Sequence, residues 1–143
     1  MLAATAEYAL RAVIALAELG PGETVLGRDL AERTGVPAAY LARILWELKH
    51  SGMVIAERGQ GGGYRLARSP EEISLQEIIA RFDPARANPG CLLWGVKPCD
   101  QLQPCPVHAR WVSIRDAYVE FLVQTTVADL VAAGGAEPSP ETT

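Results

Sequence analysis

Three cysteines are the residues of this chain best suited to chemistry, since thiolates bind metals and react with oxidants. They are spaced Cys91-x7-Cys99-x5-Cys105 within fifteen residues, and His108 follows the last of them by three positions. At the start of a helix, Cys105 and His108 would point to the same face. An odd number of cysteines cannot form a disulfide framework, so metal binding or redox chemistry is the better interpretation.

Several kinds of centre fit this arrangement. Thiolates at irregular intervals along a loop can enclose an iron–sulfur cluster, which offers several iron atoms rather than one point. A Cys3His zinc site uses the same donors, and a metal-free pair of thiols can sense oxidants by forming a disulfide. An enzyme with Cys105 as nucleophile and His108 as base is disfavoured, because the chain has no Cys-x-x-Cys motif and no evident oxyanion donors.

The cysteines lie in a Pro- and Gly-rich stretch, residues 83–105, that we predict to be a long loop between two helices. Before it, Ser74 and Glu77 form a capping box for a helix over about 75–82. After it, Pro106 suits the first turn of a helix over about 106–124. Thr126 and Asp129 then cap a short last helix within 106–132, and residues 133–143 are expected to be a disordered tail.

The helix over 106–124 carries an apolar stripe that is too bulky for a domain of this size to cover alone. We expect the stripe to pack partly on the first helix of the chain and partly on a second copy, which makes a homodimer. Its members are Val107, Trp111, Ile114, Tyr118, Phe121 and Leu122.

Residues 1–82 read as a winged helix-turn-helix. Apolar periodicity predicts helices over about 4–18, 26–33 and 37–51, with a sharp corner at Gly35 between the last two. Two strands, 53–58 and 64–68, follow and are joined by a glycine-rich tip. The fold class is therefore mainly α with a small β-hairpin wing, an α+β arrangement with a long dimerisation helix appended.

A helix-turn-helix reads DNA with a helix whose outer face is small enough to enter the major groove. The candidates on the helix over 37–51 are Ala38, Ala39, Tyr40, Arg43 and Lys49, and Arg28 lies on the preceding helix. The candidates on the hairpin are Arg58, Gly61, Gly62 and Arg65, a tip that suits a minor groove or a phosphate backbone. His50 has no partner in the sequence and at most faces a phosphate. The glycine run is not a nucleotide phosphate loop, because it lacks the Lys-Ser/Thr ending and precedes a strand.

Charge is distributed in a way that allows DNA binding despite a net charge of −4. Residues 40–68 hold five basic and two acidic side chains, whereas residues 69–143 hold five basic and ten acidic ones. Only the contact face needs positive potential. No run of eighteen apolar residues exists, and the first residues show no basic cluster. We therefore expect no membrane association, no secretory signal and a cytoplasmic location.

Two stretches carry a family resemblance. Residues 35–41 with 51–54, and then the wing motif Arg-Gly-x-x-Gly-Gly-Tyr from Arg58 to Tyr64, resemble the IscR/NsrR/RirA-type bacterial iron–sulfur winged-helix regulators over about residues 1–132. The resemblance implies that Arg58 enters the minor groove of a palindromic operator while the recognition helix reads the major groove. Relatives often carry polar residues where this chain has Pro37, Ala39 and Ala42, so its operator cannot be borrowed from theirs.

The resemblance also implies a sensor in which Cys91, Cys99 and Cys105 bind an iron–sulfur cluster with one further ligand. His108 matches the ligand of IscR-like proteins, which favours a 2Fe–2S cluster. Glu7 of the partner subunit matches the ligand of NsrR-like proteins, which favours a 4Fe–4S cluster. We favour His108. The implied function is transcriptional repression switched by iron, redox state or nitric oxide, without enzymatic activity.

Overall fold

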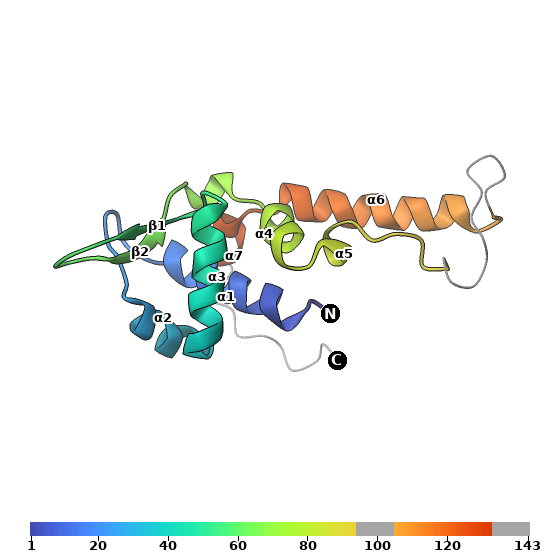
Figure 1. Cartoon of the computed structure of the whole chain (residues 1–143). Helices are drawn as coiled ribbons and strands as arrows, with labels where there is room; N and C mark the ends of the chain where they lie inside the picture. The colour runs from blue at the N-terminus through green and yellow to red at the C-terminus, as the bar shows by residue number, and fades with distance from the viewer. Residues whose placement is uncertain (94–104, 133–143) are drawn as a thin grey trace, which may run out of the picture.

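The computed structural model describes residues 1–93 and 105–132, which form a helical bundle with one long helix extending from it (Figure 1). Cys99 and the tail predicted for residues 133–143 lie outside the described residues. The elements are α1 (Ala4–Ala17), α2 (Gly27–Thr34), α3 (Ala38–His50), β1 (Val54–Glu57), β2 (Gly63–Leu66), the 3-10 helix η1 (Pro70–Glu72), α4 (Leu75–Phe82), α5 (Pro84–Ala87), α6 (His108–Gln124) and α7 (Val127–Ala132). Among them, no helix is both long and apolar enough to cross a membrane.

Helix α1 is the centre of the bundle. It contacts α2, α3, α4, α7 and β2. Its inward face consists mainly of small residues, and Ala6, Ala9 and Ala12 have no exposed surface. Small side chains let the neighbouring backbones come close, so one helix can be covered on several sides.

The helix-turn-helix is formed by α2 and α3. Helix α2 ends at Gly35, whose φ of 71° is left-handed, and the Gly35 N–H donates to the carbonyl of Ala31. This conformation suits glycine and turns the chain sharply into α3. The inward side of α3 presents Leu41, Ile44, Leu45 and Leu48, all buried, at the spacing the sequence predicted.

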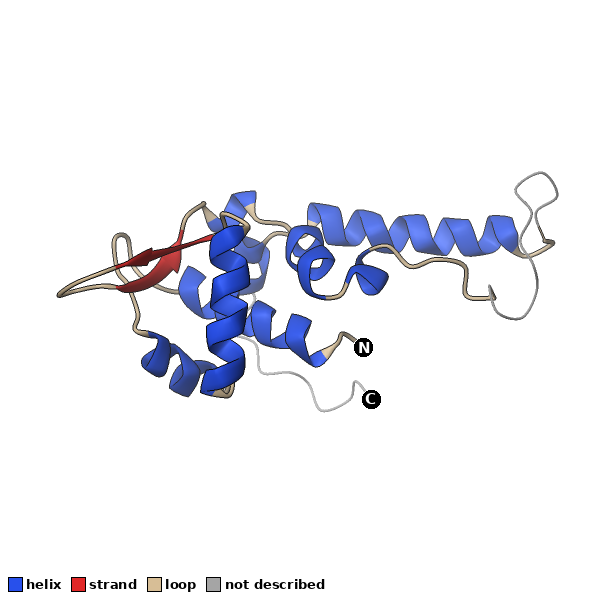
Figure 2. Cartoon of the chain, in the orientation of Figure 1, coloured by secondary structure: helices blue, strands red, loops and turns tan. Residues whose placement is uncertain are grey.

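The wing is an antiparallel hairpin in which Val54 pairs with Leu66 and Glu57 pairs with Gly63 (Figure 2). Tyr64 also pairs with Val25, which precedes α2, through N–H to carbonyl distances of 2.8 and 3.1 Å. This bridge ties the base of the wing to the helix-turn-helix. The fold class expected from sequence is confirmed: the chain is mostly helical, with a two-stranded wing.

The segment around the cysteines differs from the predicted unbroken loop, because Pro84–Ala87 form the short helix α5. Pro84 has the backbone angle of a first helical turn, which explains why the chain coils here. Two hydrogen bonds hold α5 in place. Tyr118 of α6 donates its hydroxyl to the carbonyl of Arg86 at 2.6 Å, and Asp83 accepts from the backbone N–H of Ala3 at 2.8 Å.

Helix α6 begins at His108, two residues later than predicted, because Cys105 to Val107 form a turn closed by the His108 N–H and the Cys105 carbonyl. Its C-terminal part packs on α4, and Leu122 joins Leu75 and Ile79 in a second small core. The N-terminal part of α6 extends away from the bundle (Figure 1).

We predict that Gly63→Ala destabilises the protein. A Cβ at Gly63 would lie 2.5 Å from the Val25 carbonyl oxygen, and its φ of 143° is unfavourable for other residues. We expect the free energy of unfolding in urea to fall by roughly 2 kcal/mol. Gly90→Ala is the control, since a Cβ there meets nothing within 4 Å. Equal stabilities for both variants would contradict this account of the wing base.

Candidate nucleic-acid interface and cysteine segment

The outer side of α3 is exposed and built largely from small and basic residues. Ala38, Ala39, Arg43 and Lys49 are all exposed, as predicted for a helix that enters a groove. Tyr40 is 59% exposed and its ring lies 6.0 Å from that of Tyr8 on α1, so it borders the face. Arg43 and Lys49 are long cations, and the Arg43 guanidinium can reach a base edge or a phosphate.

The wing tip presents mainly backbone, with the exposed side chains of Arg58 and Gln60. Gly59 and Gly61 both have positive φ, and the Thr24 hydroxyl donates to the Gly61 carbonyl at 2.7 Å, which fixes the tip against the segment before α2. Arg58 is exposed, and among the described residues it has no acidic partner within ion-pair distance. A narrow tip with a free guanidinium suits a minor groove.

Arg65 differs from Arg58. It is half-buried, and its Nε lies 2.8 Å from Oε1 of Glu57 on the neighbouring strand. Its charge is therefore already matched within the wing, and it is less free to bind a phosphate. Arg28 is exposed in the first turn of α2. The wing and α2 lie at the end of the molecule opposite the free end of α6 (Figure 1).

The cysteine segment joins α5 to α6. Cys91 and Cys105 are half-buried free thiols, and the Sγ of Cys91 accepts from the Leu93 N–H at 3.4 Å. His108 is half-buried in the first turn of α6, three residues after Cys105. In residues 1–93 and 105–132, no three His, Cys, Asp or Glu side chains come together as a metal site. The thiol and imidazole donors suit iron–sulfur clusters and zinc.

Glu7, the alternative fourth ligand, is exposed in the first turn of α1. It lies four residues after Ala3, whose N–H is held by Asp83 at the start of α5. The start of α1 is thus anchored to the element that leads into the cysteines. Among the described residues of one chain, Glu7 does not form a group of three or more potential metal ligands with Cys91, Cys105 or His108.

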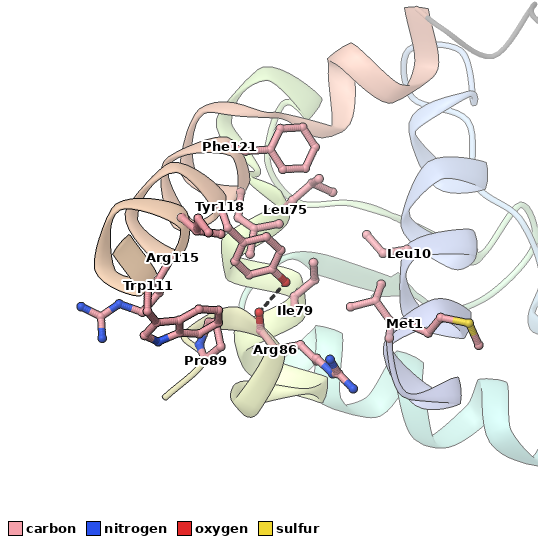
Figure 3. Close-up of a pocket in the computed structure, with 13 residues that line it drawn as sticks. Met1, Leu10, Leu75, Ile79, Arg86, Pro89, Trp111, Arg115, Tyr118 and Phe121 are labelled. Carbon is pink, nitrogen blue, oxygen red and sulfur yellow. Dashed lines mark hydrogen bonds between the residues drawn. The ribbon is translucent and has the colours of Figure 1, made fainter. Parts of the chain in front are cut away.

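An apolar groove of about 520 Å³ runs between α6, α4 and the start of α1 (Figure 3). Trp111, Tyr118 and Phe121 of α6 face Leu10, Leu75 and Ile79 across it (Figure 3). Arg86 and Arg115 also line it, and the indole N–H of Trp111 is buried without a partner among the described residues. The sequence therefore predicted the α6 stripe but not the open space beside it.

Comparison with known proteins identifies the fold's relatives. The profile of Rrf2, described as an iron-dependent transcriptional regulator, matches residues 2–133. The chain belongs to the Rrf2 family. The transcriptional regulator IscR of Escherichia coli O1:K1 is 30% identical over 130 residues, covering 91% of this chain and 79% of that protein.

Two solved structures agree with the family assignment. CymR, the global cysteine regulator of B. subtilis, superposes with a TM-score of 0.77 at 26% identity, covering 93% of this chain and 97% of that one. IscR of T. potens superposes with a TM-score of 0.73 at 25% identity, covering 94% of this chain and 88% of that one. The resemblance to IscR-type regulators is confirmed: this Rrf2 protein is a DNA-binding transcriptional regulator, and its relatives are not enzymes.

Two features escaped the sequence. Trp46 stacks on His50 along the exposed side of α3, which a search for basic residues overlooks. Asp83 holds the start of α1, and no local pattern signals a contact between residues 80 positions apart. An i, i+4 aromatic pair on the polar side of a helix was the available signal for the first.

We predict that Arg58→Ala weakens DNA binding more than Arg65→Ala, because only Arg58 is free of an acidic partner. Affinity should fall for operator and unrelated duplexes alike, and the slope of log affinity against log salt should decrease by about 1. Arg110→Ala, the same charge change on α6, is the control. A larger loss for Arg65→Ala, measured by fluorescence anisotropy, would overturn the assignment.

Proposed function

We propose that this Rrf2-family protein is a homodimeric repressor whose affinity for a palindromic operator is switched by an iron–sulfur cluster on Cys91, Cys99 and Cys105. The observation that carries the proposal is the anchoring of α5, the helix that leads into the cysteine segment, to both α6 and the start of α1. A dimer seated on its operator would block access to the promoter, and a protein bound to a bacterial chromosome would act in the cytoplasm.

The donor set supports iron. Three thiols with an adjacent imidazole match a cluster, and the description of the family as iron-dependent agrees with this choice. When bound, the cluster would supply a centre sensitive to iron supply, oxidants and nitric oxide. Zinc on the same Cys3His set is the alternative, because zinc accepts these donors readily. A metal-free thiol sensor is a further alternative, since Cys91 and Cys105 are free thiols.

His108 is our choice for the fourth ligand. It follows Cys105 on the same turn, so one segment presents both donors, whereas Glu7 would have to come from the partner subunit. A histidine ligand favours a 2Fe–2S cluster, and the acid would favour a 4Fe–4S cluster. Glu7 lies near the start of α1, which Asp83 holds against α5. The alternative, in which Glu7 of the partner subunit is the fourth ligand, is therefore tested alongside His108.

The long helix supports dimerisation. Val107, Ile114 and Phe121 recur every seven residues along α6 and are 42%, 64% and 57% exposed, while Trp111 and Tyr118 alternate with them and are half-buried. Alternating spacings of four and three are typical of a helix that packs on a second helix. We propose that α6 of a second copy covers this row and the groove of Figure 3, which would place two α3 helices and two wings on a two-fold operator.

Two hydrogen bonds connect α5, the helix before the cysteine segment, with its neighbours. Tyr118 binds α5 to α6, and Asp83 binds the start of α5 to α1, which packs on α2 and α3. A change in the order of the cysteine segment would therefore move α5 relative to both helices. We propose that this adjusts the spacing of the two winged helices, and hence operator affinity.

We predict that the protein purified without oxygen is coloured and contains iron and acid-labile sulfide. Cys91→Ser, Cys99→Ser and Cys105→Ser should each abolish the visible absorption. His108→Ala should lower cluster content strongly, whereas Glu7→Ala should not. His50→Ala, which removes the other histidine of the chain, is the control and should retain the cluster.

Operator affinity should differ between the cluster-bound and cluster-free protein in anaerobic gel-shift assays. A colourless protein with one zinc per chain would reject the cluster and support the zinc alternative. Loss of the cluster in Glu7→Ala but not in His108→Ala would reverse the choice of fourth ligand.

We predict that Ile114→Asp produces monomers, because it places a charge in the row that the second copy would cover. Sedimentation velocity should show a dimer for the wild type and a monomer for the variant. Val123→Asp is the matched control, since Val123 is 53% exposed but lies on the other side of α6. A monomeric wild type, or a dimeric Ile114→Asp, would rule out this interface.

A further inference from the structure

The exposed side of α3 continues beyond its predicted DNA-reading residues. Ala39, Arg43, Trp46 and His50 follow one another at spacings of four, three and four, and all four are exposed. They therefore form one row along the helix, opposite the buried leucines. Trp46 is 54% exposed, although an indole gains most from burial and α3 offers it no cover.

Trp46 and His50 form a preorganised pair. Their rings are stacked, with centroids 3.8 Å apart and planes inclined by 27°. The Nδ1 of His50 lies 2.8 Å from the backbone carbonyl oxygen of Trp46. Because a carbonyl oxygen only accepts, Nδ1 is the donor of this bond, which holds the imidazole stacked on the indole. The Nε2 of the ring then donates to a phosphate oxygen when the imidazole is in its doubly protonated, cationic form.

The electrostatics around the pair favour an anion. Lys49 is exposed beside His50, and Arg43 lies one turn before Trp46. Glu47 is the acid of α3, but its Oε2 accepts from both Nε and Nη2 of Arg81 on α4, at 2.8 and 2.7 Å. The negative charge of Glu47 is therefore paired with Arg81 of α4. The pair is a flat aromatic surface between cations.

We propose that the Trp46–His50 pair is a further DNA contact, which rests on the sugar–phosphate backbone at the edge of the groove that α3 enters. This inference rests on α3 being the DNA-facing helix. Three observations favour DNA over a protein partner: the row is continuous with Arg43, its flanking side chains are basic, and its acid is neutralised by Arg81. An indole over a deoxyribose with a phosphate beside His50 uses both the apolar and the polar parts of the pair.

The test compares two duplexes, an operator selected by the wild-type protein from a random-sequence library and a scrambled sequence of equal length. Trp46→Ala should weaken binding to both by roughly tenfold, as removal of a well-placed aromatic contact does. His50→Ala should weaken both severalfold, and the double variant should lose less than the product of the two, because the rings act together. Trp46→Phe should restore most of the affinity.

Arg43→Ala and Val123→Ala are the comparison variants. Arg43→Ala should lower the ratio of operator to scrambled affinity, whereas the Trp46 and His50 variants should leave that ratio unchanged, since backbone contacts carry no sequence information. Val123→Ala, an exposed apolar truncation on α6, should bind as the wild type does. Because Trp46 and His50 are exposed, the Trp46→Ala and His50→Ala variants should unfold at temperatures near that of the wild type.

The outcomes separate this inference from the DNA-binding surface itself. If Arg43→Ala and Arg58→Ala leave binding unchanged, the proposed surface fails and the inference fails with it. If those variants bind weakly but Trp46→Ala binds normally, the inference alone is overturned. A Trp46→Ala protein that binds DNA normally yet no longer controls transcription would indicate a protein partner and would also overturn it.

Discussion

The close packing around α1 is the constraint on which the rest of this structure depends. Its alanine face lets α2, α3, α4, α7 and the base of the wing all touch one helix, which sets where each of them can lie. A larger side chain at Ala6, Ala9 or Ala12 would push these elements apart, because none of the three has free surface. The same helix is held at its start by Asp83. Helix α1 thus contacts α2, α3 and the wing strand β2, and its start is bonded to Asp83, which leads into α5 and the cysteine segment.

The two ends of the molecule differ in chemistry. The end with α2, α3 and the wing is basic and built from small outer side chains, which is what a surface that approaches a duplex needs. The other end carries half-buried thiols, an imidazole and an apolar row on α6. The two surfaces lie at opposite ends of the molecule (Figure 1).

Communication between the ends has few possible routes. Helix α6 packs on α4, and α5 is held to α6 through Tyr118 and to α1 through Asp83. Both contacts are single hydrogen bonds to backbone groups, and each contributes about 1 kcal/mol. Contacts of this size suit a switch, because the ordering of a short segment is enough to alter them. A partly exposed ion pair between Glu47 and Arg81 also links α3 to α4, the helix on which α6 packs.

Local sequence determined the elements and the chemistry of the candidate sites. Apolar spacing located α1, α3, α4 and α6 to within a few residues, Gly35 predicted the corner, and the capping box at Ser74 predicted the start of α4, because each depends on neighbours in the chain. The three cysteines as candidate ligands, and Arg58 as the arginine of the wing motif, can likewise be identified from the sequence alone. What only the tertiary structure decided is which of these groups are free. Glu57 forms an ion pair with Arg65, and Arg81 forms one with Glu47. Asp83 accepts a hydrogen bond from the backbone N–H of Ala3. The first of these contacts depends on the register of the wing hairpin, and the other two join segments 34 and 80 residues apart, so no periodicity within one segment encodes them.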